Sequence, residues 1–280
     1  MPPGINAYEV AAGTRNRPAE ALAPVALRAI AAAREANVKL GEIEFPALLG
    51  EKTAYDDVDN VQILNWNRDW CMASMQPLAG ELDGELWLAF PDRKELELAR
   101  EEWPGAAYAK ATLTTLEDAA EVLSGSSDQA WGAAFARAAE GLLGTSNLGA
   151  KPETTTAPAP QVVVAVQPGD GGPMEDWLNL ELLRTDGVPL VCVNGALDKV
   201  CSGYYSNFLN PKLGECAARF FDRFDQAYYL KPIGSGRGWL FRVYGEPWQL
   251  FRQTREDLEL AETYEARPTP AECVERLKRP

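Results

Sequence analysis

The chain has 280 residues, of which 46% are hydrophobic and 24% are charged, so it can bury a sizeable core. Its 41 acidic and 27 basic side chains give a formal net charge of -14, which repels phosphate backbones and argues against DNA or RNA as a partner. The longest apolar runs, such as residues 162–166, are far shorter than the roughly 20 residues of a membrane-spanning helix. We therefore expect no transmembrane segment, and a soluble or peripheral protein.

Two features of the composition restrict the chemistry. The chain contains no histidine, which excludes Ser-His-Asp and Cys-His nucleophile activation and removes the commonest metal-ligating side chain. The number of cysteines is odd and no two have C-x-x-C spacing, so neither a disulfide framework nor a zinc site is expected. From these patterns we predict no catalytic residue, no metal site and no cofactor. The cysteines are interpreted as reduced structural residues: Cys71, Cys192, Cys201, Cys216 and Cys273.

Residues 1–17 have no apolar core and no clear period, and we interpret them as an N-terminal extension or the remnant of a transit segment. Beyond them, helical and strand-like patterns alternate. Helical spacing of apolar residues predicts helices at 18–37, 56–79, 93–103, 116–123 and 128–143. Alternating apolar residues predict strands at 40–46, 84–92 and 110–116. Strands that alternate with helices indicate a parallel sheet with crossover connections.

Residues 144–160, rich in Gly, Thr and Pro, are predicted to form an exposed, flexible loop within a single domain that spans residues 18–280. The segments QVVVAV at 161–166 and VPLVCVNGAL at 188–197 are apolar on both faces, as central strands are. A helix at 213–224 then precedes three or four short strands without helices between them. The predicted fold is α/β, with a mostly parallel central sheet flanked by helices and extended by C-terminal antiparallel strands.

Three polar residues lie at the ends of predicted parallel strands: Asp92, Asp170 and Asn194. Open α/β sheets bind ligands in the crevice at the carboxyl ends of their strands, so these residues are candidates for a ligand crevice. The alternative is that they cap helices, which Asp and Asn do well.

Two glycine-rich segments resemble anion-binding turns. PGDGGP at 168–173 lies between a strand and a helix, but it lacks the spacing of dinucleotide and P-loop motifs, so a simple turn is favoured. GSGRG at 234–238 carries Arg237, a candidate for binding an anion. Its alternative interpretation is a tight hairpin with a solvated arginine.

The C-terminal part of the chain is rich in aromatic residues interspersed with arginine. In alternating strands half of the side chains fill the core, and the others are available to a partner. Because Tyr, Trp and Arg dominate interface hot spots, we predict a protein-docking surface in this region. The candidate residues are Tyr228, Tyr229, Trp239, Arg242, Tyr244, Trp248 and Arg252.

The chain contains, in this order, the segments EIEFP, AFPD, VVVAVQP, PLVCVN, FFDRFDQAYYLKPIGSGRGWLFRVYGEPWQLF and YEARPTPAE. This order resembles the uncharacterised chloroplast domain family typified by the low photosystem II accumulation assembly factors of plants and algae. The resemblance extends over most of the chain beyond residues 1–17 and concerns fold-forming residues, so it transfers no catalytic residue.

The resemblance implies a protein of the chloroplast stroma or of the stromal face of the thylakoid, linked to photosystem assembly. A related domain is fused to a plant adenylate kinase, which points to binding or regulation. We therefore expect a non-catalytic protein that associates with photosystem or thylakoid membrane proteins, as an assembly factor or peripheral subunit. The alternative is a small-molecule or nucleotide-binding module, or an enzyme, that uses the crevice at the strand ends.

Overall fold

The computed structural model describes residues 27–28, 30–32, 34–46, 60–82, 85–103, 110–124, 157–169, 174–202, 205, 210–254 and 258–279. The predicted extension at 1–17, the predicted helix at 128–143, most of the predicted loop at 144–160 and the crevice candidate Asp170 lie outside these described residues.

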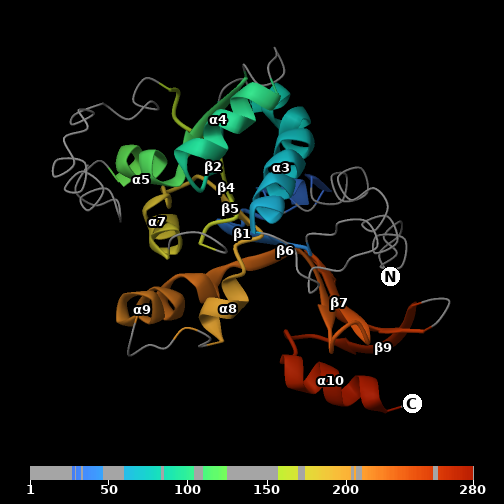
Figure 1. Ribbon diagram of the computed structural model, residues 1–280. Helices are drawn as coiled ribbons and strands as arrows, with labels where there is room; N and C mark the ends of the chain where they lie inside the picture. The colour runs from blue at the N-terminus through green and yellow to red at the C-terminus, as the bar shows by residue number, and fades with distance from the viewer. Residues whose placement is uncertain are drawn as a thin grey trace.

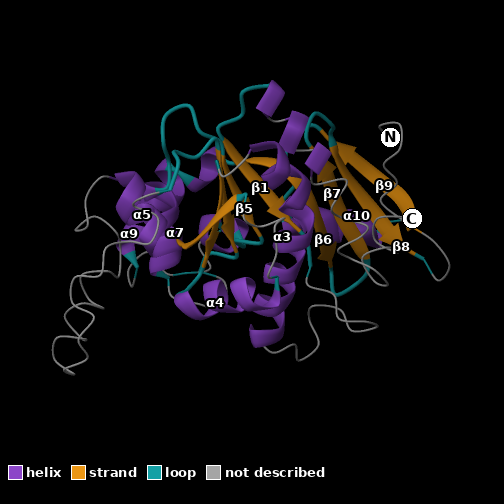
Figure 2. Ribbon diagram, turned by 90° about the horizontal axis from the view of Figure 1, so that it is seen from above, coloured by secondary structure: helices purple, strands orange, loops and turns teal. Residues whose placement is uncertain are grey.

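Within the described residues, nine strands form a single sheet in the order β3-β2-β4-β5-β1-β6-β7-β8-β9 (Figures 1 and 2). The strands are β1 (Leu40–Glu44), β2 (Leu86–Phe90), β3 (Ala111–Thr115), β4 (Val162–Val166), β5 (Leu190–Val193), β6 (Asp225–Ile233), β7 (Gly238–Val243), β8 (Trp248–Gln253) and β9 (Leu258–Tyr264). From β3 to β6 neighbouring strands are parallel, and β7, β8 and β9 continue the sheet as an antiparallel meander. The predicted α/β fold with its antiparallel C-terminal extension is confirmed.

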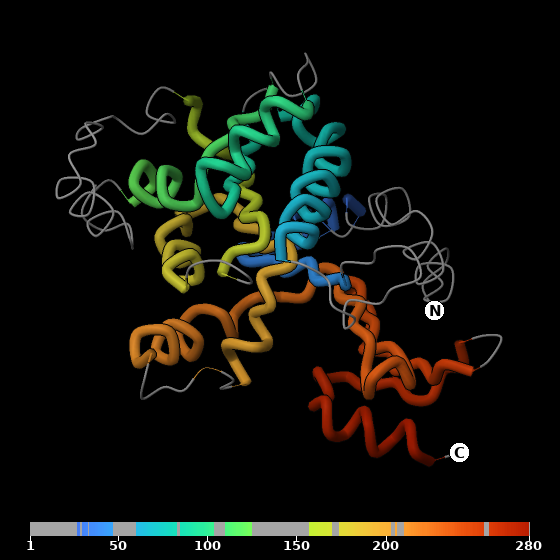
Figure 3. The backbone as a smooth tube through the Cα atoms, viewed as in Figure 1, coloured from blue at the N-terminus to red at the C-terminus, as the bar shows by residue number. Residues whose placement is uncertain are grey.

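Helices cover both faces of the sheet. The helices are α3 (Asn60–Leu82), α4 (Arg93–Glu102), α5 (Leu116–Ser124), α7 (Glu175–Leu182), α8 (Leu197–Cys201), α9 (Pro211–Arg219) and α10 (Pro270–Lys278), with a short 3-10 helix η2 (Phe221–Arg223). One face packs against α3 and α4, and the opposite face packs against α5, α7, α8 and α9. The last helix, α10, covers the antiparallel strands and forms a third, smaller hydrophobic cluster with them. Figure 3 shows these C-terminal elements gathered at one end of the molecule.

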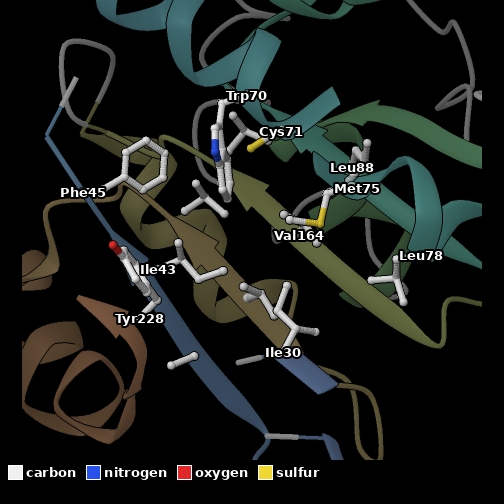
Figure 4. Packing of buried hydrophobic residues seen from close by; sticks show 14 of the residues in the cluster. Ile30, Ile43, Phe45, Trp70, Cys71, Met75, Leu78, Leu88, Val164 and Tyr228 are labelled. Atoms are coloured by element: carbon white, nitrogen blue, oxygen red, sulfur yellow. The ribbon is translucent and has the colours of Figure 1, made fainter. Parts of the chain in front are cut away.

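The apolar strand sequences explain why the parallel part of the sheet is buried between two helical layers. In β4, Val162, Val164 and Val166 face α3, whereas Val163 and Ala165 face α7. Figure 4 shows Trp70 and Met75 of α3 lying over this first face. The ring of Trp70 packs against that of Phe45, with 4.6 Å between centroids. None of the described helices is both long and apolar enough to cross a lipid bilayer.

Gly238 tests how closely the antiparallel strands approach. A Cβ atom at this position would lie 2.2 Å from the carbonyl oxygen of Phe251 on β8. We expect Gly238→Ala to lower the free energy of unfolding by about 1–3 kcal/mol, because the neighbouring backbone must shift. Gly80→Ala is the matched control, since no atom of another described segment lies within 4 Å of a Cβ at that position of α3. It should raise stability by about 0.5–1 kcal/mol. Equal effects in urea denaturation would contradict this packing.

Candidate functional site

After the neighbouring strands β1 and β5, the chain continues to opposite faces of the sheet. These two strands are neighbours in the sheet, but α8 follows β5 on one face while α3 follows β1 on the other. In open α/β sheets, ligands bind where neighbouring strands diverge in this way. Asn194 lies there, directly after β5, as the sequence predicts.

The side chain of Asn194 connects the strand ends to a helix. Its Oδ1 accepts a hydrogen bond from the backbone N–H of Phe45 at 2.8 Å, and its Nδ2 donates to Oδ1 of Asn67 in α3 at 2.6 Å. The Nδ2 of Asn67 in turn donates to Oε1 of Gln167, the residue after β4, at 2.5 Å. Both Asn194 and Gln167 have left-handed backbones, with φ of 50° and 42°. This buried network stabilises the strand ends and places Asn194 in a structural role.

Asp92 serves as a helix cap. It precedes α4, and its Oδ1 accepts the backbone N–H of Glu95 at 2.9 Å. Asp92 follows β2, and β4 separates β2 from β5, so the structure does not bring Asp92 and Asn194 to one strand end. Asp92 thus caps a helix, which is the alternative interpretation given above. Asn194 instead connects the end of β5 to the residue that follows β1.

A buried acid that the sequence reasoning missed lies in the first turn of α7. The side chain of Asp176 is 5% exposed, and its Oδ2 has no hydrogen-bond partner among the described residues. Burial raises the pKa of Asp176 to about 8, and the negative charges of Asp92 and Glu175 add to this shift. An acid in a first helical turn normally indicates a favourable, exposed position, so the sequence contains no signal of its burial.

A cavity of about 500 Å³ lies between α8, the β6–β7 hairpin and the segment that leads into α10. We call it the α8–α10 pocket. Its polar wall includes Asp198, Tyr229, Lys231 and Arg267, which interact with one another, and also Ser202, Asp222 and Thr269. Its apolar wall consists of Pro232, Ile233, Leu240, Pro268, Pro270 and Val274. A concave, mainly apolar site with a few convergent polar groups is typical of small-molecule binding.

The polar wall is held together by interactions between its own members. Nζ of Lys231 lies 2.5 Å from Oδ2 of Asp198, and the guanidinium of Arg267 lies 3.9 Å from the same oxygen. Arg267 also donates to the hydroxyl of Tyr229 at 2.8 Å. The carbon at the centre of its guanidinium lies 4.7 Å from the ring centroid of Tyr229 and 5.4 Å from that of Trp248. These contacts fix the orientation of Arg267.

The cations of the pocket are permanently charged near neutral pH. Burial lowers the pKa of Lys231, but the acidic groups around it, Tyr229, Glu44 and Asp198, outweigh burial and raise it above its ordinary value. Burial also opposes the charge of Arg267, and Tyr229, Glu42 and Asp198 again raise its pKa overall. These two groups are therefore suited to holding an anion and cannot act as bases at neutral pH.

Glu42 of β1 lies next to this charged wall and is buried. Burial raises the pKa of Glu42, while Arg267 and a hydrogen bond from Gln226 act against that rise. The bond runs from Nε2 of Gln226 to Oε2 of Glu42 at 3.1 Å. The net shift is upward, because burial outweighs these groups, which favour the charged form of Glu42.

One family model matches most of the chain. The family described as a domain of unknown function, DUF1995, matches residues 19–275. The chain belongs to this family. No curated protein and no solved structure matches it.

In this DUF1995 domain, the predicted aromatic docking surface is largely core, which corrects that expectation. Tyr228, Tyr229, Trp239 and Trp248 are at most 2% exposed. Tyr228 and Trp239 belong to the hydrophobic cluster on one side of the sheet. Tyr229 and Trp248 belong to the cluster under α10, so side chains on both faces of these strands are buried.

The three remaining docking candidates of the DUF1995 domain are half-buried. Arg242 donates to the backbone oxygen of Glu246 at 3.3 Å and to Oε1 of Gln226 at 3.2 Å. Arg252 donates to the backbone oxygen of Arg279. Tyr244 lies in the turn after β7. Both arginines thus stabilise the antiparallel extension internally.

Arg237, the candidate for anion binding, is exposed in the turn between β6 and β7. Three consecutive residues before it, Gly234, Ser235 and Gly236, have positive φ. The hairpin interpretation of GSGRG therefore describes the structure, with Ile233 paired to Gly238 across the turn.

Sequence reasoning missed three charged members of the α8–α10 pocket: Asp198, Lys231 and Arg267. Asp198 lies in α8, a helix of five residues that is too short to show a helical period. Lys231 and Arg267 occur in the segments on which the family resemblance rests, but nothing in the sequence places either of them beside Asp198. The three come from separate elements: Asp198 from α8, Lys231 from β6 and Arg267 from the segment between β9 and α10.

Asp176 predicts a pH dependence of stability. The folded chain keeps this acid protonated up to about pH 8, whereas its ordinary pKa is 3.8. Its contribution is therefore complete below about pH 4 and is lost as the pH rises toward 8. We expect Asp176→Asn to gain stability relative to wild type across this window, measured by urea denaturation at several pH values. Asp186→Asn, at an exposed acid, is the control. A difference from wild type that stays constant with pH would refute the assignment.

Proposed function

We propose that this DUF1995 protein associates with photosystem or thylakoid membrane proteins in the chloroplast, as an assembly factor or peripheral subunit. The observation that carries the proposal is the family match over residues 19–275, together with the order of motifs that resembles photosystem assembly factors. Lys231 and Arg267 of the α8–α10 pocket stay protonated at neutral pH, which suits the pocket to hold an anion.

The edge strand β9 is the surface that we assign to the partner. Among the described residues β9 pairs with β8 alone, and it is the last strand of the sheet. Leu260, in the middle of β9, is 54% exposed. An edge strand presents backbone donors and acceptors to which an extended segment of another protein can add as a further strand. This surface replaces the aromatic patch expected from the sequence.

The alternative function, a small-molecule or nucleotide module at the strand ends, receives less support from the geometry. Asp92 caps α4, and Asn194 is bonded to Phe45 and Asn67. The two candidates that the structure describes thus hold the fold together, and the third, Asp170, lies outside the described residues.

Leu260→Lys tests the assignment of β9. Affinity purification with the tagged wild-type chain from solubilised thylakoids should recover photosystem or membrane-insertion subunits. The variant should recover at least about tenfold less, because a lysine on an edge strand opposes strand addition and an apolar anchor is lost.

Val61→Lys is the matched control, since Val61 is also an exposed aliphatic residue, 48% exposed, but lies in α3. It should recover as much as wild type. Recovery of no thylakoid subunit by the wild-type chain would refute the proposed function, whereas equal recovery by Leu260→Lys would refute only the role of β9.

A further inference from the structure

The two cations of the α8–α10 pocket share a single ion-pair partner among the described residues. Among the described residues, the one acid within ion-pair distance of Arg267 is Asp198, 3.9 Å away. Asp198 is already bound by Lys231 at 2.5 Å. Asp222 also lines the pocket, but it forms no ion pair with either cation within the described part of the chain. The carboxylate of Asp198 therefore interacts with both cations, and its attraction to Arg267 is the weaker because the distance is longer.

Arg267 is also preorganised to receive an oxyanion. The rings of Tyr229 and Trp248 hold its guanidinium, which is 33% exposed. The guanidinium has five N–H groups. Within the described residues it donates one hydrogen bond, to the hydroxyl of Tyr229. The remaining donors form a planar fork that matches a carboxylate or a phosphate, and little side-chain entropy is lost when the fork is already held.

A large part of the pocket wall is apolar and rigid. Pro232, Pro268 and Pro270 restrict the backbone on two sides, and Ile233, Leu240 and Val274 supply aliphatic surface. The volume of about 500 Å³ falls within the range of about 300–1,000 Å³ that small-molecule sites occupy. An ion without an apolar part would leave this aliphatic surface in contact with water.

We propose that the α8–α10 pocket binds a small amphiphilic acid, whose carboxylate or phosphate head pairs with Arg267 and Lys231 and whose apolar body packs against Ile233, Leu240 and Val274. The carboxylate and the phosphate share one recognition chemistry, namely a planar set of oxygens that accepts two parallel N–H bonds. This site is separate from β9 and goes beyond protein docking, so each proposal can fail while the other holds.

Three probes with the same alkyl chain separate the contributions of head and body: octanoate, octyl phosphate and octanol. Binding to the full chain is measured by isothermal titration calorimetry near neutral pH. At least one of the two acids should bind, and octanol should bind at least about tenfold more weakly than that acid, because it lacks the charge-assisted bonds. The acid that binds more tightly identifies the head group.

Arg267→Gln removes the charge of the fork, and affinity for the better acid should fall at least about tenfold. Arg276→Gln is the matched control, because Arg276 lies on α10 but pairs with Glu262 at 3.1 Å outside the pocket. Its affinity should equal that of wild type. If Arg267→Gln does not fold, Val274→Trp decides, since filling the pocket with a larger side chain should abolish binding.

The proposal is overturned if neither acid binds, if octanol binds as tightly as the acids, or if a folded Arg267→Gln variant retains wild-type affinity. Retained binding in Val274→Trp would likewise overturn it.

Discussion

The parallel pairing of β1 with β6 is the interaction on which the rest of the structure depends. It joins the helix-covered parallel half of the sheet to the antiparallel extension, since β1 contacts β5 on one side and β6 on the other. The register shifts between Glu42 and Ile43, so the two halves do not continue in one regular ladder. The shift lets Ala227 and Tyr228 both pack on the α3 side, while Tyr229 packs beneath α10.

A consequence of this join is a layer of charge between two hydrophobic clusters. Buried charges are tolerated only when they are paired or hydrogen-bonded, because desolvation is otherwise too costly. Glu42, Asp198, Lys231 and Arg267 meet where the cluster under α8 and α9 ends and the cluster under α10 begins. Mutual pairing stabilises this layer, and the space that remains between its members is the α8–α10 pocket.

The fold could be predicted from the sequence because its strands carry strong local signals. The runs VVVAV and LVCV are apolar on both faces, and both became central strands. The docking surface was predicted because alternation in β7 and β8 indicates one exposed face. Their side chains are instead buried on both faces, in two different hydrophobic clusters. Asp92 fits a local rule, the helix cap. No local rule predicts the pocket residues, because Asp198, Lys231 and Arg267 come from distant segments and meet only in the folded structure.

The bond between Asn194 and the backbone of Phe45 joins residues 149 positions apart, and it sets an order of events during synthesis. The ribosome makes β1 first, yet both neighbours of β1 come from the second half of the chain. At about 5–20 residues per second, the strand at the centre of the finished sheet waits on the order of ten seconds for β5. During that interval neither of the strands that flank β1 in the finished sheet has been made, so β1 joins the sheet only after more than half of the chain exists.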